Sequence, residues 1–257
     1  METTKLRILL TNDDGFNAEG LQTLYSELKM KADVTIAAPD RERSAVSHGI
    51  TMYHPLRAIP VTIETASHWM IDGTPADCVK LAVERLFSVP PDLVISGINR
   101  GPNLGNDVLY SGTVSAAIEG AINHIPSIAV SLAEFGKADF KPAAQFVTQK
   151  LNQLAELARH AVLNLNFPMR CRGVKLTRLG ERRYENVFDE RVDPRGQTYF
   201  WMGGQPVQSV QFQDTDIQAV DDGYISITPL HFDLTDHQFL HDQNLCDLFA
   251  SGISYPE

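Results

Sequence analysis

The stretch that most constrains the fold is LRILLTNDDG, which occupies residues 6–15. A short apolar run that ends in polar residues and a glycine is typical of a buried strand in a parallel sheet. Asn12, Asp13 and Asp14 follow the carboxyl end of this strand, where open α/β sheets bind ligands. Residues 17–28 carry leucines and a tyrosine at helical spacing. The segment therefore predicts a strand, an acidic turn and a helix.

The acidic turn allows two interpretations when this stretch is taken alone. Two adjacent carboxylates repel each other unless a cation or a proton relieves the repulsion, and this favours a metal site. The other interpretation is a solvated acidic turn that caps the following helix. The distinction depends on what the other strand ends carry.

The chain up to Pro168 predicts a Rossmann-like, doubly wound α/β fold with a mainly parallel sheet. One helix separates the first strand from a second at residues 33–38, and a βαβ unit of this kind makes its two strands parallel. Residues 51–72 predict a hairpin. Further core strands are expected at residues 92–98, 128–132 and 162–168. One long helix is expected over residues 141–161, with an inner face of Phe146, Leu151, Leu154, Leu157 and Ala158.

The pattern changes after Pro168. Residues 169–257 contain irregular strand-like pieces, a clear strand YISITPL, an acidic stretch QDTDIQAVDDG that is expected to be irregular, and a C-terminal helix over residues 233–250. We predict a single domain over residues 1–257, in which residues 1–168 form the α/β body and residues 169–257 an appended β-rich and helical region. Apolar pieces such as YFWMGG are awkward to cover within one subunit, so this region is expected to mediate oligomerisation.

The composition limits the partners and the location of the protein. A formal net charge of −10 argues against binding to a nucleic acid duplex or an anionic membrane through bulk charge. No apolar run is long enough for a membrane span, and the N-terminus leads directly into the first strand, without room for a signal peptide. The cysteines Cys78, Cys171 and Cys246 are odd in number and far apart. A reducing cytoplasm is the expected location.

Three predicted strand ends carry oxygen-rich polar side chains. They are Asp13 and Asp14, then Ser44, then Asn99. Right-handed crossovers between parallel strands bring these ends to one edge of the sheet. Carboxylate, hydroxyl and amide oxygens are hard ligands that suit Mg²⁺ or Mn²⁺. Taken one at a time, Ser44 can equally be a loop hydroxyl and Asn99 a turn former, so only their coincidence favours a metal site.

A glycine-rich loop and a helix start supply the features of a phosphate site. Ser111, Gly112 and Thr113 follow this loop, and a helix N-terminus offers free N–H groups and a partial positive charge. Asn103 in the loop adds an amide donor. Ser111 and Thr113 can alternatively serve only as helix caps. A metal beside a phosphate site is the outline of a centre that hydrolyses phosphoryl groups.

The main alternative is a metal-binding α/β module of the bacterial receiver type. A receiver also carries paired acids after its first strand, but it needs a phosphoacceptor Asp at the end of the third core strand. Here that strand ends in Asn99, which cannot form an acyl phosphate. Water bound to the metal is therefore the expected nucleophile, and Asp13 is a candidate to assist the proton.

Several motifs in order resemble the SurE family of stationary-phase survival proteins. They are TNDDG, PDRERSAVSHGIT, DGTPADCV and SGINRGPNLGNDVLYSGTVSAAIEG. The resemblance implies a phosphatase that acts on nucleoside 5′- and 3′-monophosphates, and in some members on short polyphosphate, as a homodimer or homotetramer. It implies one divalent cation per subunit, Mg²⁺ or Mn²⁺, held by Asp13, Asp14, Ser44 and Asn99, of which Asp13 and Asp14 are also the expected catalytic residues. The expected phosphate and substrate ligands are Asn12, Asn103, Ser111, Gly112 and Thr113.

Overall fold

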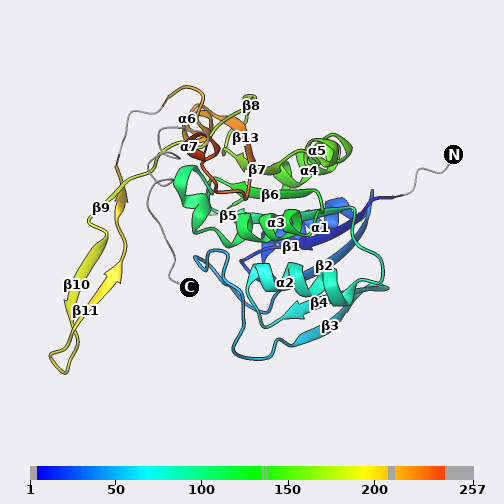
Figure 1. The fold of residues 1–257 in the computed structure, drawn as a ribbon, viewed down its shortest axis with the longest axis horizontal. Helices are drawn as coiled ribbons and strands as arrows, with labels where there is room; N and C mark the ends of the chain where they lie inside the picture. Colours follow the sequence, from blue (N-terminus) through cyan, green and yellow to red (C-terminus); the bar gives the residue numbers. More distant parts are fainter. Residues whose placement is uncertain (1–4, 135, 137, 208–211, 241–257) are drawn as a thin grey trace, which may run out of the picture.

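The structure, a computed structural model of the chain, describes residues 5–134, 136, 138–207 and 212–240. Nine strands of this part of the chain form one sheet in the order β3-β4-β2-β1-β5-β6-β7-β13-β8 (Figure 1). They are β1 (Arg7–Thr11), β2 (Asp33–Pro39), β3 (Ala58–Ile63), β4 (Ala66–Ile71), β5 (Leu93–Arg100), β6 (Ser127–Leu132), β7 (Val162–Phe167), β8 (Gly173–Leu176) and β13 (Tyr224–Leu230). From β4 through β2, β1, β5 and β6 to β7 all pairings are parallel. The predicted α/β class with a mainly parallel sheet is confirmed.

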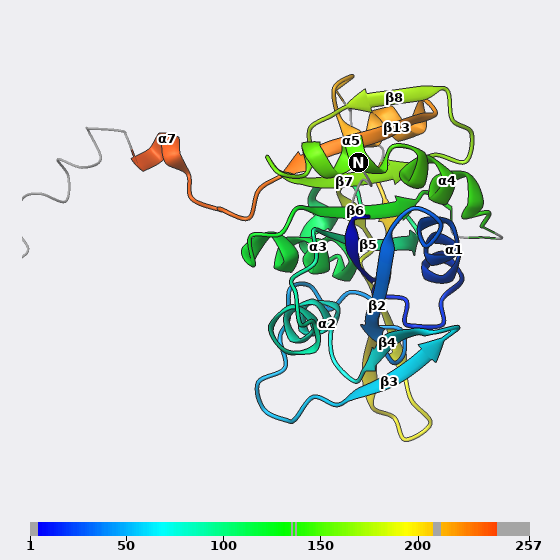
Figure 2. The same ribbon diagram turned by 90° about the vertical axis from the view of Figure 1, so that its right-hand side faces the viewer.

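Helices cover both faces of this sheet (Figure 2). One face carries α1 (Glu19–Leu28), α4 (Lys141–Gln149) and α5 (Leu151–Leu157), and the other carries α2 (Pro75–Leu81) and α3 (Gly112–Ile122). Within β1, Ile8 and Leu10 belong to the core under the first set of helices, whereas Leu9 belongs to the core under the second. The strand is buried on both sides, which explains its uninterrupted apolar sequence.

One buried carboxylate fixes the start of α2 and the loop that precedes β3. Asp77 accepts hydrogen bonds from the backbone N–H of Thr74 at 2.9 Å and of Thr51 at 2.9 Å, and from Thr51 Oγ1 at 2.6 Å. Thr74 Oγ1 accepts from the Asp77 N–H in return, which completes a capping box. The loop between β2 and β3 is therefore anchored where it reaches α2.

Two secondary-structure predictions are wrong. The single helix expected over residues 141–161 is divided at Lys150 into α4 and α5. The break changes the phase of the apolar face, so Leu151 and Leu154 are buried while Leu157, expected on the inner face, is 52% exposed. The acidic stretch expected to be irregular contains α6 (Asp216–Asp221), with Thr215 as its N-cap.

The sheet continues beyond residue 168, the expected limit of the α/β body. Strand β13 pairs antiparallel with β7 and parallel with β8. The segment between them forms an arm, residues 184–206, built from β9 (Tyr184–Glu185), β10 (Phe188–Val192), β11 (Thr198–Met202) and β12 (Gln205–Pro206). Figure 1 shows β10 and β11 extending away from the sheet. The expected C-terminal helix is described only as α7 (His237–Leu240), and residues 241–257 lie outside the described part.

We predict that Gly20→Ala lowers the stability of the fold. A Cβ atom at this position of α1 would lie 2.0 Å from the backbone oxygen of Ile98 in β5. The helix would have to move away from the strand, at a cost of roughly 1–3 kcal/mol. Urea denaturation measures this free energy. Ser26→Ala, at an exposed position of the same helix, is the control and should change it by less than about 0.5 kcal/mol; equal stability of the two variants would contradict the packing described.

Candidate active site

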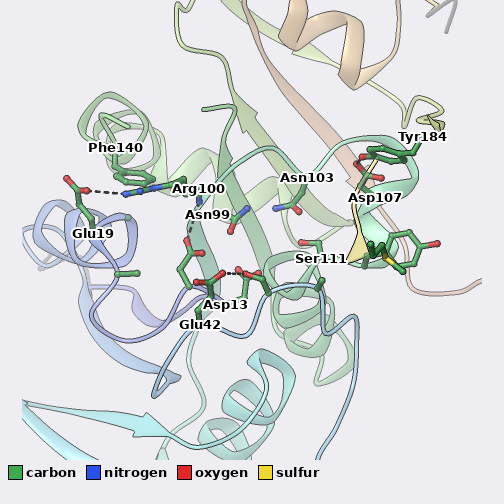
Figure 3. A pocket seen from close by; sticks show the side chains of 18 of the residues that line it. Asp13, Glu19, Glu42, Asn99, Arg100, Asn103, Asp107, Ser111, Phe140 and Tyr184 are labelled. Carbon is green, nitrogen blue, oxygen red and sulfur yellow. Dashed lines mark hydrogen bonds and ion pairs between the residues drawn. The ribbon is translucent and has the colours of Figure 1, made fainter. Parts of the chain in front are cut away.

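Six of the nine residues expected at the site line one cavity of about 1020 Å³. The cavity lies beyond the carboxyl ends of β1, β2 and β5 and beside the start of α3 (Figure 3). The six residues are Asp13, Asp14, Ser44, Asn99, Asn103 and Ser111. The other three, Asn12, Gly112 and Thr113, are buried next to lining residues and are not part of the lining themselves.

Asn12 shapes the turn that presents the two carboxylates. Its fully buried side chain accepts a hydrogen bond from the Gly15 N–H at 3.2 Å and donates one to the Gly15 oxygen at 3.0 Å. Gly15 has a φ of +102°, and a Cβ atom there would lie 3.0 Å from the backbone of Arg41. Only glycine fits this conformation without strain. The Asn12 side chain therefore binds the turn, and its position gives it no contact with the cavity.

Asp13 is fixed against the start of α3. Its Oδ1 accepts a hydrogen bond from Thr113 Oγ1 at 2.5 Å, and a Cβ atom at Gly112 would lie 2.8 Å from the Asp13 Cβ. Asp13 is only 5% exposed. Burial raises its pKa from 3.8 to about 6, because water no longer stabilises the charge, and the neighbouring charge of Asp14 adds to the shift. The Thr113 hydroxyl is committed to this carboxylate.

Asp14 and Asn99 lie on the β5 side of the cavity. Asp14 Oδ2 accepts a hydrogen bond from the backbone N–H of Arg100 at 3.2 Å. Burial raises the pKa of Asp14, and the carboxylate of Glu42 contributes in the same direction. The Asn99 amide nitrogen donates to the Gly101 oxygen at 2.8 Å. The side-chain oxygen of Asn99 is then the atom that can serve as a hard ligand.

Ser44 reaches the cavity on the loop after β2. Backbone hydrogen bonds tie this loop to both halves of the site. The Arg43 N–H donates to the backbone oxygen of Asp13 at 2.7 Å, and the Ser47 N–H donates to the backbone oxygen of Tyr110 at 3.2 Å. Ser44 itself is exposed, and its Oγ donates to Glu42 Oε1 at 2.7 Å. The loop therefore closes one side of the cavity with a carboxylate and a hydroxyl next to each other.

The start of α3 and the loop before it form the other end of the cavity. Ser111 Oγ accepts from the Val114 N–H at 3.1 Å and caps the helix. The Asn103 amide donates to Ser131 Oγ at 2.8 Å, and its backbone N–H donates to Asn166 Oδ1 at 2.8 Å. These contacts fasten the loop to β6 and β7. The first N–H groups of a helix have no acceptor within the helix, so this end can bind an anion.

The donor set fits a hard divalent cation. Two carboxylates, one hydroxyl and one amide oxygen border the same space, and such oxygens suit Mg²⁺ or Mn²⁺. Among the described residues, no three His, Cys, Asp or Glu side chains form a metal-binding group, so a nitrogen- and sulfur-rich zinc centre of that kind is not found there. The raised pKa values of Asp13 and Asp14 indicate two carboxylates whose charge is poorly solvated, which a cation would relieve.

Sequence reasoning missed most of the cavity walls. One flank holds Phe140 near Arg100 and Glu19, and the opposite flank holds Tyr184 beside Asp107 (Figure 3). The second flank also includes Tyr110, Val187, Met202 and Gly203. The arm residues come from a stretch without a recognisable motif or period, so no local signal connects them with a site that lies far away in the sequence.

Comparisons with a protein family, with individual relatives and with a solved structure agree with one another. The protein family described as Survival protein SurE matches residues 8–186. Relatives that carry the name 5′-nucleotidase SurE match most of the chain, and two of them serve as examples. The relative from Desulforamulus reducens is 54% identical over 91% of this chain and 96% of its own length. The relative from Syntrophomonas wolfei is 52% identical over 91% of this chain and 92% of its own length. The crystal structure of the SurE protein from Aquifex aeolicus superimposes with a TM-score of 0.81 at 37% identity, covering 94% of this chain and 99% of that one.

We predict that Asp13→Asn stabilises the protein when divalent cations are absent. The folded state raises the pKa of Asp13 to about 6, so the folded protein binds this proton more tightly than the unfolded chain does. The ionised carboxyl therefore opposes folding above pH 6, and this contribution disappears as the pH falls through 6 towards 4. Removing this unfavourable charge should raise the free energy of unfolding by on the order of 1–3 kcal/mol at pH 8.

Urea denaturation in the presence of EDTA at pH 8 and at pH 4.5 measures this effect. The difference between wild type and Asp13→Asn should be large at pH 8 and small at pH 4.5. Asp33→Asn, at an exposed position where β2 begins, should match wild type at both values. A difference between Asp13→Asn and wild type that does not change with pH would refute the assigned pKa.

Proposed function

Because the chain belongs to the SurE family, we propose that it is a divalent-metal-dependent phosphatase that hydrolyses nucleoside 5′- and 3′-monophosphates to nucleoside and phosphate. The observation that carries the proposal is that Asp13, Asp14, Ser44 and Asn99 line the same cavity as the start of α3. Hard oxygen ligands and an anion site meet there, as phosphoryl hydrolysis requires. The relatives named as 5′-nucleotidases support the nucleotide substrate.

One divalent cation per subunit, Mg²⁺ or Mn²⁺, is the proposed cofactor, and its ligands are Asp13, Asp14, Ser44 and Asn99. When bound, such a cation offsets the charge of the phosphoryl oxygens and lowers the pKa of a water molecule. The protein fixes the carboxylates before the cation arrives, through Thr113 on Asp13 and the Arg100 N–H on Asp14. Little reorganisation is then needed on binding.

The proposed phosphate site is the N-terminus of α3 together with Asn103. Backbone N–H groups of Gly112 and Thr113 and the hydroxyl of Ser111 would hold the phosphoryl oxygens. The contact of Thr113 Oγ1 with Asp13 supports a second task for Thr113, which is to orient the carboxylate. Asn12, expected as a substrate ligand, acts through the turn that carries Asp13 and Asp14.

Direct transfer to water is the proposed reaction. Strand β5 offers Asn99 where a receiver would need a nucleophilic carboxylate, and the two nearby carboxylates are assigned to the cation. Asp13 is the proposed acceptor of the proton from the attacking water, because its carboxylate lines the cavity next to the proposed cation and phosphate sites. The cavity also has room for a short polyphosphate, which we propose as a secondary substrate.

The proposed assembly is a homodimer or homotetramer joined through the arm. Strands β10 and β11 form a two-stranded sheet of their own, and Phe188, Phe200 and Trp201 on them are largely exposed. An isolated two-stranded ribbon is only marginally stable in water, and exposed aromatic side chains on both of its faces favour an interface that encloses the ribbon. A second copy of the chain would cover it.

The proposed location is the cytoplasm. Cys78 is buried as a free thiol and Cys171 is free and exposed, which suits a reducing compartment. Within the described residues, no helix combines the length and the apolar character that crossing a membrane demands.

We predict that EDTA abolishes phosphate release from AMP and that Mg²⁺ or Mn²⁺ restores it. Asp14→Asn should lower kcat at least 100-fold, because one charged ligand is lost, while the fold stays intact. A colorimetric phosphate assay and circular dichroism measure the two properties. Asp33→Asn, the same substitution at the amino end of β2, is the control and should keep its activity. Full turnover by EDTA-treated, metal-free protein would contradict a metal-dependent reaction.

We also predict that light scattering at micromolar concentration gives two or four times the chain mass of 28.5 kDa. Trp201→Ser combined with Phe200→Ser should shift the protein towards the monomer, because both side chains would leave the proposed interface. Met30→Ser is the matched control, as it removes an exposed apolar side chain in the turn after α1. A wild-type protein that is monomeric under these conditions would rule out the assembly.

A further inference from the structure

The cavity is much larger than a cation and a phosphoryl group require. Its volume of about 1020 Å³ lies at the upper end of the range of roughly 300–1,000 Å³ for ligand pockets. The carboxylates and the α3 start occupy only one part of its lining. The remaining lining consists of two flanks, which Figure 3 shows on opposite sides of Asp13.

The flank at Phe140 offers little free ring surface. Phe140 is buried, and the Arg100 guanidinium lies over its ring, 5.8 Å from the centroid. Arg100 is in turn paired with Glu19 at 3.4 Å. The ring face and the cation are therefore already engaged with each other on this side.

The opposite flank is apolar, aromatic and open. Tyr110 is 63% exposed, Tyr184 40% and Met202 74%, and all three line the cavity together with Val187. Flat aromatic rings and a polarisable thioether are side chains that stack on nucleobases. The charges at this flank, Asp107 and Arg182, neutralise each other at 2.9 Å. An uncharged base fits this wall better than the continuation of a polyanion.

A hydrogen-bond network fixes this wall relative to the phosphate end. Tyr184 OH donates to Asp107 Oδ2 at 2.5 Å, and Arg182 Nη1 donates to the same oxygen. The Arg182 backbone N–H donates to Asn106 Oδ1 at 2.6 Å. Asn106 and Asp107 belong to the 3₁₀ turn η2 (Gly105–Leu109), which leads directly into Tyr110 and Ser111. The arm and the start of α3 are thus joined through a few consecutive residues.

We propose that Tyr110, Tyr184, Val187 and Met202 form the nucleobase subsite of this cavity, and that Asp107 is a positioning residue that fixes the Tyr184 ring. The inference rests on the proposed phosphatase function of the phosphate end. It assigns substrate selectivity to the arm, since three of the four side chains come from it. The base stacks on this wall while the phosphate lies at the α3 start.

The test compares AMP with ribose 5-phosphate, which has the same phosphate and sugar without the base. Tyr184→Leu should lower kcat/KM for AMP at least fivefold, as the loss of a base–aromatic stack does, and should leave kcat/KM for ribose 5-phosphate within twofold. Tyr184→Phe keeps the ring and should retain most of the selectivity. Asp107→Asn should raise the KM for AMP with little change in kcat. Tyr53→Leu, at a fully exposed tyrosine outside the cavity, is the control.

Inhibition by adenosine gives a second readout that does not depend on turnover of AMP. The inhibition constant of adenosine, measured with ribose 5-phosphate as the substrate, should rise at least fivefold in the Tyr184→Leu variant. Equal losses for AMP and ribose 5-phosphate would overturn the subsite while leaving the phosphatase function intact. A change in oligomeric state with equal losses would also overturn it and identify the wall as a contact between subunits. A wild-type protein that hydrolyses no nucleotide would instead remove the proposed function and this inference with it.

Discussion

The hydrogen bond from Thr113 Oγ1 to Asp13 Oδ1 connects the two ends of the candidate site. It links the turn after β1 to the first turn of α3, and the missing side chain at Gly112 allows this close approach. Asn12 and Gly15 hold the turn from the other side. The distance between the proposed metal ligands and the proposed phosphate site therefore depends on one buried contact and on the packing that surrounds it.

This arrangement carries an electrostatic cost that explains its chemistry. Asp13 is nearly removed from water, and Asp14 and Glu42 place further negative charge around the cavity. Ordinary proteins avoid such a cluster unless a cation or a proton neutralises it. The loop after β2 remains attached across the cluster through Arg43 and Ser47. The fold thus holds negative charge in a fixed geometry, which is what a hard cation needs for binding.

The sequence alone predicts the parts of the site that strand ends determine. Asp14 follows β1 and Asn99 lies at the carboxyl end of β5, so the parallel sheet brings them together by topology. The sequence does not predict the direction of side chains. Thr113, for example, is expected as a phosphate ligand, but its hydroxyl donates to Asp13. The α6 helix was missed because its stability depends on long-range contacts, with Asp216 accepting N–H groups from Gly105 and Gly180. Tyr184 was missed for the same reason, since long-range contacts of Arg182 and Tyr184 with Asp107 bring the start of the arm to the cavity.

Anomalous diffraction from crystals grown with Mn²⁺ and a non-hydrolysable AMP analogue tests the central claim most directly. Our account predicts one manganese peak per subunit, surrounded by oxygens of Asp13, Asp14, Ser44 and Asn99, with the phosphonate oxygens of the analogue next to the N-terminus of α3. A manganese peak away from these four residues would contradict it. So would a phosphonate group bound at a distance from Ser111.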